Sequence, residues 1–205
     1  MKDTKSYLSK IVQDMPDSGI KDFFDVANTM EGALSLGVGE PDFPTPEHVR
    51  EAAIASIKKG DTKYTDNRGT VELRAAAADY LTKFDLHYDK QDEILITMGA
   101  SEGIDLALRT LVNPGEEVLV AEPSYVSYIP CIELCGGVPV SLKLRAENKF
   151  RLTREQLEEK ITEKSKVLLI SYPNNPTGAR MEKEDLEAIA EVVKEHDLFV
   201  ITDEI

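Results

Sequence analysis

The feature that most constrains the fold of this chain is a regular alternation of apolar runs and amphipathic stretches that begins near residue 91. The apolar runs predict strands, and the amphipathic stretches between them predict helices. Strands are expected at residues 93–97, 118–121, 138–142, 167–171 and 199–202, with helices at 101–111, 125–135, 154–161 and 183–195. Because apolar strands alternate with helices, the pattern predicts an α/β fold with a mostly parallel sheet and helices on both of its faces.

Two of these helices carry strong local signals. Thr153 is followed three residues later by Gln156, a spacing that is typical of a capping box at a helix start. Leu186, Ala190 and Val193 recur, with Ile189, at the spacing of one helical face. The charged residues between them therefore form the solvated side of that helix.

The first ninety residues are less regular. Local patterns predict an amphipathic helix at 18–30, an extended segment at 34–36 and an alanine-rich helix at 70–84. Thr45 and Pro46 predict a helix start, with Thr45 as the N-cap and Pro46 at the first helical position, and Gly60 predicts its end. We expect residues 1–45 to form an N-terminal arm and part of a small domain or lid, and residues 46–205 to form an incomplete large domain.

Charge and hydropathy exclude several classes of function. The 205 residues include 24 Lys and Arg against 38 Asp and Glu, so the formal net charge is −14. Such a surface repels phosphate backbones, which argues against nucleic acid as the main partner. The longest apolar runs, such as residues 167–170, are too short to span a bilayer, and no secretory signal follows the N-terminus. We therefore expect a cytoplasmic protein with no membrane partner.

Cys131 and Cys135 lie four residues apart in a predicted helix and could supply half of a metal site. No other Cys or His lies near them in the sequence, and the three histidines are scattered. Free cysteines also behave as small apolar residues. We expect these two to pack in the core, and we expect no metal.

Polar residues follow four of the predicted strands, where ligands bind in open α/β sheets. Gly99, Ala100 and Ser101 open a helix after the first strand and present amide groups that suit a phosphate. Tyr125 follows the second strand, Asn175 lies in a proline-rich loop after the fourth, and Asp203 ends the fifth. Taken singly, each has a plain alternative: a strand-to-helix turn, a core aromatic ring, an ordinary loop and a turn carboxylate.

Taken together, these four strand ends point to one ligand. A phosphate cradle, an aromatic ring for stacking, a carboxamide for a ring hydroxyl and a carboxylate for a protonated ring nitrogen describe the needs of pyridoxal 5'-phosphate. The carboxylate would keep the pyridine ring protonated, so that the ring serves as an electron sink. The turn at Gly99 matches neither a dinucleotide fingerprint nor a Walker loop, which disfavours a nicotinamide-dependent oxidoreductase.

Six motifs lie in order along nearly the whole chain: SLGVGEPDF at 35–43, YT at 64–65, TMGASE at 97–102, PSY at 123–125, YPNNPTG at 172–178 and TDE at 202–204. With these motifs the sequence resembles the class I/II aminotransferases, the aspartate aminotransferase superfamily of fold type I enzymes. Each motif is common alone, but this order and spacing are specific. The resemblance implies the large domain of that fold, truncated before its C-terminal small domain.

The resemblance also implies roles for single residues. Gly99, Ala100 and Ser101 correspond to the phosphate-binding turn, and Tyr125 to the aromatic residue that stacks on the pyridine ring. Asp203 corresponds to the partner of the ring nitrogen.

Three further positions are implied to complete the site. Asn175 corresponds to the residue that bonds the cofactor's 3-oxygen and assists the substrate carboxylate. Gly39 corresponds to a backbone contact to that carboxylate. Tyr64 corresponds to a tyrosine that reaches the phosphate of the neighbouring subunit, which implies a homodimer with shared active sites.

One element of the family is missing from the chain. The family's Schiff-base lysine lies about thirty residues beyond the position of Ile205 on this resemblance. Lys166 does not substitute for it, because it begins a predicted strand and so lies at the wrong edge of the sheet. We therefore expect the chain to be an N-terminal portion that contains no catalytic residue and is inactive alone.

The resemblance implies that the intact protein is a transaminase, exchanging an amino group between an L-amino acid and a 2-oxo acid. Two alternatives stay open. One is a carbon–sulfur β-lyase of the same superfamily, and the other is a non-catalytic fragment. Residues 1–205 do not identify the amino acid.

Overall fold

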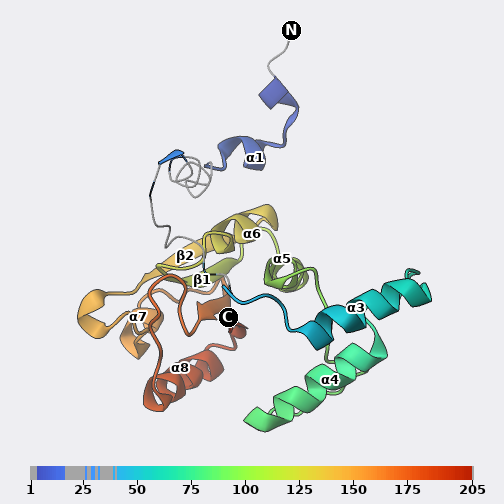
Figure 1. Ribbon diagram of the computed structural model, residues 1–205. Helices are drawn as coiled ribbons and strands as arrows, with labels where there is room; N and C mark the ends of the chain where they lie inside the picture. Colours follow the sequence, from blue (N-terminus) through green and yellow to red (C-terminus); the bar gives the residue numbers. More distant parts are fainter. Residues whose placement is uncertain are drawn as a thin grey trace. The chain divides into compact units, whose positions relative to one another are not determined.

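The computed structural model describes residues 4–16, 26, 29–30, 32, 39 and 41–204. The chain divides into two compact units (Figure 1). The sheet unit comprises Met1–Pro16 and Met98–Ile205. The other unit comprises Asp17–Thr97 and is called the two-helix unit here, after the two longest helices among its described residues. The predicted helix at 18–30 and extended segment at 34–36 fall almost entirely outside the described residues.

The sheet unit contains a four-stranded sheet in which every pair of neighbours is parallel. Its strands are β1 (Glu117–Glu122), β2 (Val138–Lys143), β3 (Ser165–Ser171) and β4 (Phe199–Asp203), in the spatial order β2-β1-β3-β4. Four of the five predicted strands are thus confirmed, and so is the parallel α/β fold.

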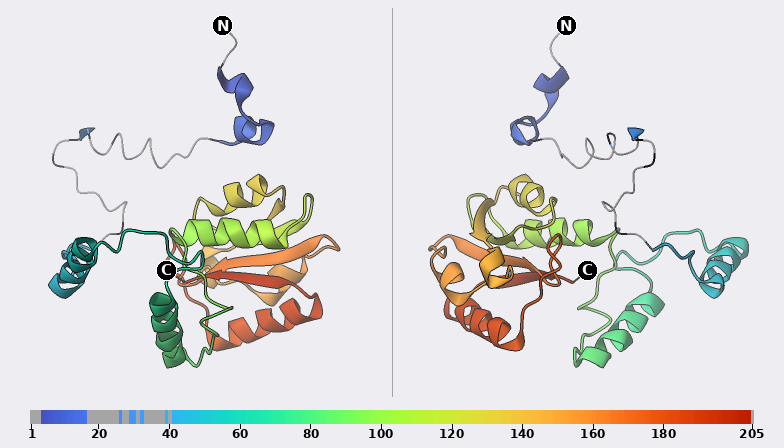
Figure 2. Two further views of the ribbon diagram at one scale, coloured as in Figure 1. Left: turned by 90° about the vertical axis from the view of Figure 1, so that its right-hand side faces the viewer. Right: turned by 60° about the vertical axis from the view of Figure 1, so that its left-hand side comes forward.

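Helices cover both faces of this sheet (Figure 2). They are α5 (Ala100–Leu111), α6 (Tyr128–Leu134), α7 (Arg154–Glu158) and α8 (Lys183–Glu195); η1 (Thr4–Tyr7), α1 (Lys10–Asp14) and η3 (Ala146–Asn148) complete the unit. Alternate residues of each strand face opposite sides. On β3, Leu168 packs in a buried cluster with residues of α7 and α8, whereas Leu169 packs in a second cluster with residues of α5 and α6.

The four predicted helices of this unit occur, and three of them have shifted ends. The helix at 183–195 matches α8 at both ends, and Thr153 and Gln156 form the predicted capping box. The helix at 125–135 begins only at Tyr128, because the residues after β1 form a turn first. Cys131 and Cys135 are half-buried and pack against the cluster beside α5 and α6, as expected.

Residues 93–97 form no strand, and this prediction is wrong. A strand needs a neighbour to pair with, and the amide of Ile96 instead donates to the carbonyl of Arg68, 3.0 Å away. A Cβ on Gly69, whose φ is +93°, would lie 2.5 Å from Cγ1 of Ile96. The apolar run therefore packs against a turn rather than against a sheet.

The two-helix unit contains α3 (Glu47–Lys59), α4 (Val71–Leu81) and the short helix η2 (Thr82–Phe84). The N-cap of α3 is Pro46 rather than the predicted Thr45, while Gly60 ends the helix with φ +84° as predicted. Thr70 caps α4 by accepting a hydrogen bond from the amide of Leu73 at 3.3 Å.

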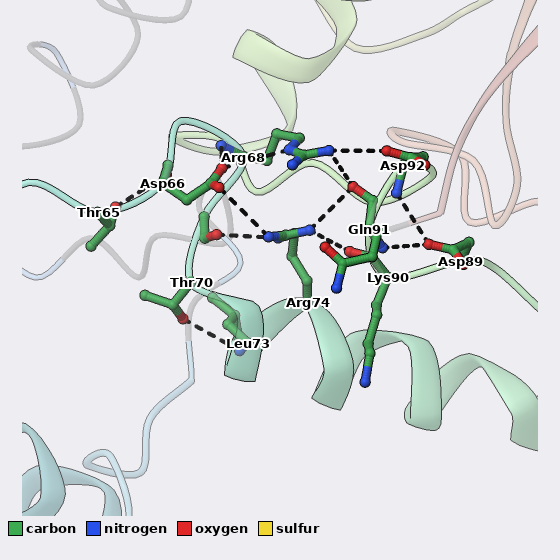
Figure 3. A network of polar contacts seen from close by, with 11 residues as sticks. Thr65, Asp66, Arg68, Thr70, Leu73, Arg74, Asp89, Lys90, Gln91 and Asp92 are labelled. Atoms are coloured by element: carbon green, nitrogen blue, oxygen red, sulfur yellow. Dashed lines mark hydrogen bonds and ion pairs between the residues drawn. The ribbon is translucent and has the colours of Figure 1, made fainter.

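One buried arginine holds the turn before α4 to the segment that follows η2 (Figure 3). Arg74 is 1% exposed, and its guanidinium donates to the carbonyls of Gly69 (3.1 Å), Lys90 and Gln91 (3.3 Å). It also lies 3.9 Å from the carboxylate of Asp66. The amide of Arg68 donates to that carboxylate, and this bond, with the nearby arginines, holds the pKa of Asp66 below its ordinary value.

No helix in the described ranges is both long enough and apolar enough to cross a membrane.

Candidate cofactor site

A cavity of about 420 Å³ lies at the carboxyl ends of the strands in the sheet unit. Its volume falls in the range of small-molecule sites. Eight residues line it: Met98, Gly99, Ala100, Ser101, Tyr125, Asn175, Asp203 and Glu204. The structure therefore brings together six of the eight residues that the sequence singled out, although they come from four separate segments of the chain.

The amino end of α5 forms one wall of this cavity. Gly99 is the N-cap, with φ +86°, and the next two residues begin the helix. The first amide groups of a helix have no partner within it and point outward, which favours an anion. The amide of Met98 donates to the carboxylate of Glu102 in the first turn, and this bond fixes the approach to the helix.

Tyr125 and Asp203 meet the same buried side chain, that of Tyr128. Tyr125 is 36% exposed, and its ring lies edge-on to that of Tyr128 with centroids 5.8 Å apart. The hydroxyl of Tyr128 donates to Oδ2 of Asp203 at 2.7 Å. Burial, and then the hydrogen bond to Asp203, raise the pKa of Tyr128 to about 12, so the hydroxyl stays protonated and remains a donor at neutral pH.

Asp203 owes its position to the sheet. It ends β4 and pairs in register with Ser171 at the end of β3, so its half-buried side chain lies at the carboxyl edge. Oδ2 accepts the Tyr128 hydrogen bond. Oδ1 takes no part in this hydrogen bond, which leaves it able to bond a ligand.

Two adjacent asparagines in the loop after β3 have different surroundings. Asn174 is 4% exposed; its side-chain amide donates to the carbonyl of Pro123 at 3.2 Å, and its Oδ1 accepts from the Thr177 hydroxyl at 2.8 Å. Asn174 thus ties this loop to the one after β1. Asn175, half-buried, lines the cavity instead.

Gly39 and Tyr64 belong to the two-helix unit, and neither is among the described residues that line the cavity. Both are exposed.

Sequence reasoning missed Tyr128 and the bracing role of Asn174. Tyr128 lies three residues after Tyr125, within the predicted helix at 125–135, so its closeness to Tyr125 was open to prediction. Its contact with Asp203 joins residues 75 positions apart. No pattern of neighbouring residues predicts a contact between two side chains so far apart in the sequence.

The lining residues described above include no lysine. Lys166 is the second residue of β3, at the amino end of the sheet, with Nζ 5.7 Å from the centroid of the Phe199 ring. Within the described ranges, no group of three or more His, Cys, Asp or Glu is placed to hold a metal ion.

Comparison with known proteins shows the class to which this fold and site belong. Residues 31–205 match the family "Aminotransferase class I and II", so the chain belongs to this family of pyridoxal phosphate-dependent enzymes. It is 44% identical to aromatic-amino-acid aminotransferase 2 of Thermococcus litoralis, over 97% of this chain and 51% of that protein. It is also 44% identical to an aspartate aminotransferase of Pyrococcus abyssi, over 92% of this chain and 49% of the relative.

A solved structure supports the same assignment. The aspartate aminotransferase from Thermus thermophilus with maleate superimposes with a TM-score of 0.90 at 36% identity, over 97% of this chain and 53% of that chain. The chain thus spans about half the length of the curated relatives and solved structures that it matches.

Proposed function

We propose that this chain forms the cofactor-binding part of a pyridoxal phosphate-dependent aminotransferase that exchanges an amino group between an L-amino acid and a 2-oxo acid. The observation that carries the proposal is one cavity lined by residues at the ends of three strands and at the amino end of α5, in a chain that belongs to the aminotransferase family.

The residues present fit the cofactor. The amino end of α5, with the hydroxyl of Ser101, suits a phosphate group. Tyr125 offers a ring face, Asn175 a carboxamide and Asp203 a carboxylate with one oxygen already oriented by Tyr128. Bound there, pyridoxal phosphate supplies an electron sink for the bond changes at the substrate α-carbon.

The lining groups then have distinct tasks in the proposed reaction. Asp203 holds a proton on the ring nitrogen, because a carboxylate favours the charged form of a nearby cation. Asn175 bonds the ring oxygen and helps to orient the substrate carboxylate. Tyr125 and the α5 amides hold the ring and the phosphate in place. Among the described lining residues there is no lysine that could move the proton at the substrate α-carbon.

We also propose a cytoplasmic homodimer, with Tyr64 serving the neighbouring subunit's site and Gly39 contacting the substrate. Tyr64 is fully exposed in the described chain. Several large apolar side chains of the two-helix unit are at least half exposed, as expected of a surface that a partner covers: Phe43, Ile54, Ile57, Leu73, Tyr80 and Phe84.

The test measures half-reaction rates of the full-length protein with a panel of L-amino acids that includes aspartate and aromatic residues. Asp203→Ala should lower the rate about 100-fold, because a preorganised charge at the reacting system is lost. Glu163→Ala, an exposed carboxylate near the amino end of β3, is the matched control.

Two results would contradict the proposal. Unchanged rates in Asp203→Ala would remove the role of that carboxylate. Release of pyruvate and ammonia from cystathionine without an oxo-acid acceptor would assign the protein to the β-lyases. The 205-residue chain alone should show no transaminase activity, and a borohydride-reducible adduct of pyridoxal phosphate at one defined lysine would overturn that expectation.

A further inference from the structure

Tyr128 contacts both the aromatic and the anionic wall of the cavity without lining it. It is the first residue of α6 and is fully buried. Its hydroxyl lies 2.7 Å from Oδ2 of Asp203, and its ring lies at 78° to that of Tyr125. One rigid side chain therefore sets the surroundings of two residues from different strand ends.

The physical consequence concerns the orientation of Asp203. Hydrogen bonds to a carboxylate are short and stronger than those between neutral groups. A buried phenol has little freedom to turn away, so its donor stays aimed at Oδ2. The carboxylate of Asp203 is thereby held in one rotamer, with Oδ1 taking no part in this hydrogen bond.

We propose that Tyr128 is a positioning residue, whose hydroxyl fixes the Asp203 carboxylate in the orientation that partners the ring nitrogen of the cofactor. This inference rests on the proposed function, because it assigns Asp203 to that nitrogen. If Tyr128 only stabilised the fold, its hydroxyl would affect the binding of every ligand equally. A positioning role predicts an effect only on ligands that have the ring nitrogen, so the two roles can be distinguished.

The experiment measures dissociation constants of the full-length apoprotein for two probes. One is pyridoxal 5'-phosphate, and the other is its analogue with carbon in place of the ring nitrogen. The ratio of the two constants reports the contact at that nitrogen alone, since effects on the phosphate, the ring face and the general fold cancel. Tyr128→Phe keeps the ring against Tyr125 and removes only the hydroxyl.

We expect Tyr128→Phe to reduce the preference for pyridoxal phosphate about tenfold, which corresponds to about 1.4 kcal/mol. In an Asp203→Ala background, the same change should leave the ratio unaltered, because the hydroxyl has no carboxylate to orient. Tyr172→Phe is the matched control: its hydroxyl contacts Leu152 and Phe150 through backbone groups, and its loss should not change the ratio.

The outcomes separate the two claims. A wild-type protein that does not prefer pyridoxal phosphate over the analogue contradicts the function assigned to Asp203. A wild-type preference that survives intact in Tyr128→Phe overturns the positioning role alone. An equal fall in the Tyr172→Phe control, or a further fall in the Asp203→Ala background, would also overturn it.

Discussion

The two units of this chain are stabilised internally by different kinds of contact. The buried apolar residues of the described chain, from Ile104 to Leu198, all belong to the sheet unit, where they form two clusters on the two faces of the sheet. In the described residues 41–97 of the two-helix unit, the only buried side chain is that of Arg74. The sheet unit thus has a core of its own, whereas the two-helix unit depends on directional polar contacts.

This difference assigns different tasks to the two units. An aliphatic core is close-packed and resists local opening, so it suits the strand ends that carry the candidate cofactor site. A polar network around one guanidinium fixes the path of the chain but buries little apolar surface. The two-helix unit is therefore the part whose exposed apolar side chains we expect a partner to cover.

The largest effect is expected from Leu168, at the centre of the sheet unit. Leu168→Ala should lower the free energy of unfolding by about 3 kcal/mol, because it removes buried methyl groups and leaves a cavity in β3. Urea denaturation followed by circular dichroism measures this change. Leu186→Ala on α8, where the side chain is 44% exposed, is the control and should cost about 0.5 kcal/mol. Equal losses in the two variants would contradict the view that β3 carries the core.

A smaller and more local effect is expected from Arg74. Arg74→Met keeps much of the side-chain volume but removes the donors to Gly69, Lys90 and Gln91, at a cost of about 2 kcal/mol. The loss should appear as faster amide hydrogen exchange in residues 66–96, with little change in exchange along the strands of the sheet unit.

The control for this prediction is Arg68→Met. Arg68 belongs to the same network, but its side chain is 44% exposed, so its removal should cost less than about 1 kcal/mol. If Arg74→Met accelerates exchange in β1 and β3 as much as in residues 66–96, the stability of the sheet unit depends on the contacts within the two-helix unit, which contradicts this prediction.

The sequence predicts helices well, because neighbouring residues along the chain specify them. It fails for a strand, whose formation depends on a distant segment with which it can pair. The helix α8 was predicted at both ends because an apolar stripe and a run of charges specify it within thirteen residues. The apolar run at 93–97 has the composition of a strand, yet a strand forms only with a neighbour, and here the run packs against Gly69. Periodicity describes a segment but not its partner.

The candidate site shows the same limit. Most of its residues could be predicted because parallel strands end at one edge, which brings Tyr125, Asn175 and Asp203 to a common place. Gly99 joins them as the N-cap of α5, although no strand precedes that helix. Their support could not be predicted. Asn174 and Asn175 are chemically identical neighbours, and only the fold shows that the first braces the loop and the second lines the cavity.

The smallest effect concerns the hydrogen bond between Tyr128 and Asp203 in the sheet unit. It tests whether burial contributes more than this polar contact to the raised pKa of Tyr128. Burial comes first and the Asp203 hydrogen bond second among the causes that raise the pKa of Tyr128 to about 12. Asp203→Ala should therefore lower the pKa of Tyr128, but leave it above the ordinary value of about 10. Titration of ¹³Cζ-labelled tyrosine by NMR measures the change.

The sign of the accompanying stability change follows from linkage. Because the folded protein holds the Tyr128 proton more tightly than the unfolded chain, this group stabilises the fold fully below pH 10, and the contribution is lost as pH rises through about 12. In Asp203→Ala the loss should still begin near pH 10 but should be complete at a lower pH, because only the folded-state pKa is changed. Tyr172, whose pKa burial also raises to about 12, lies beside Asp185 rather than Asp203 and should titrate as before. If the pKa of Tyr128 fell all the way to its ordinary value, the hydrogen bond would outweigh burial, and the sheet unit would depend on directional contacts as the two-helix unit does.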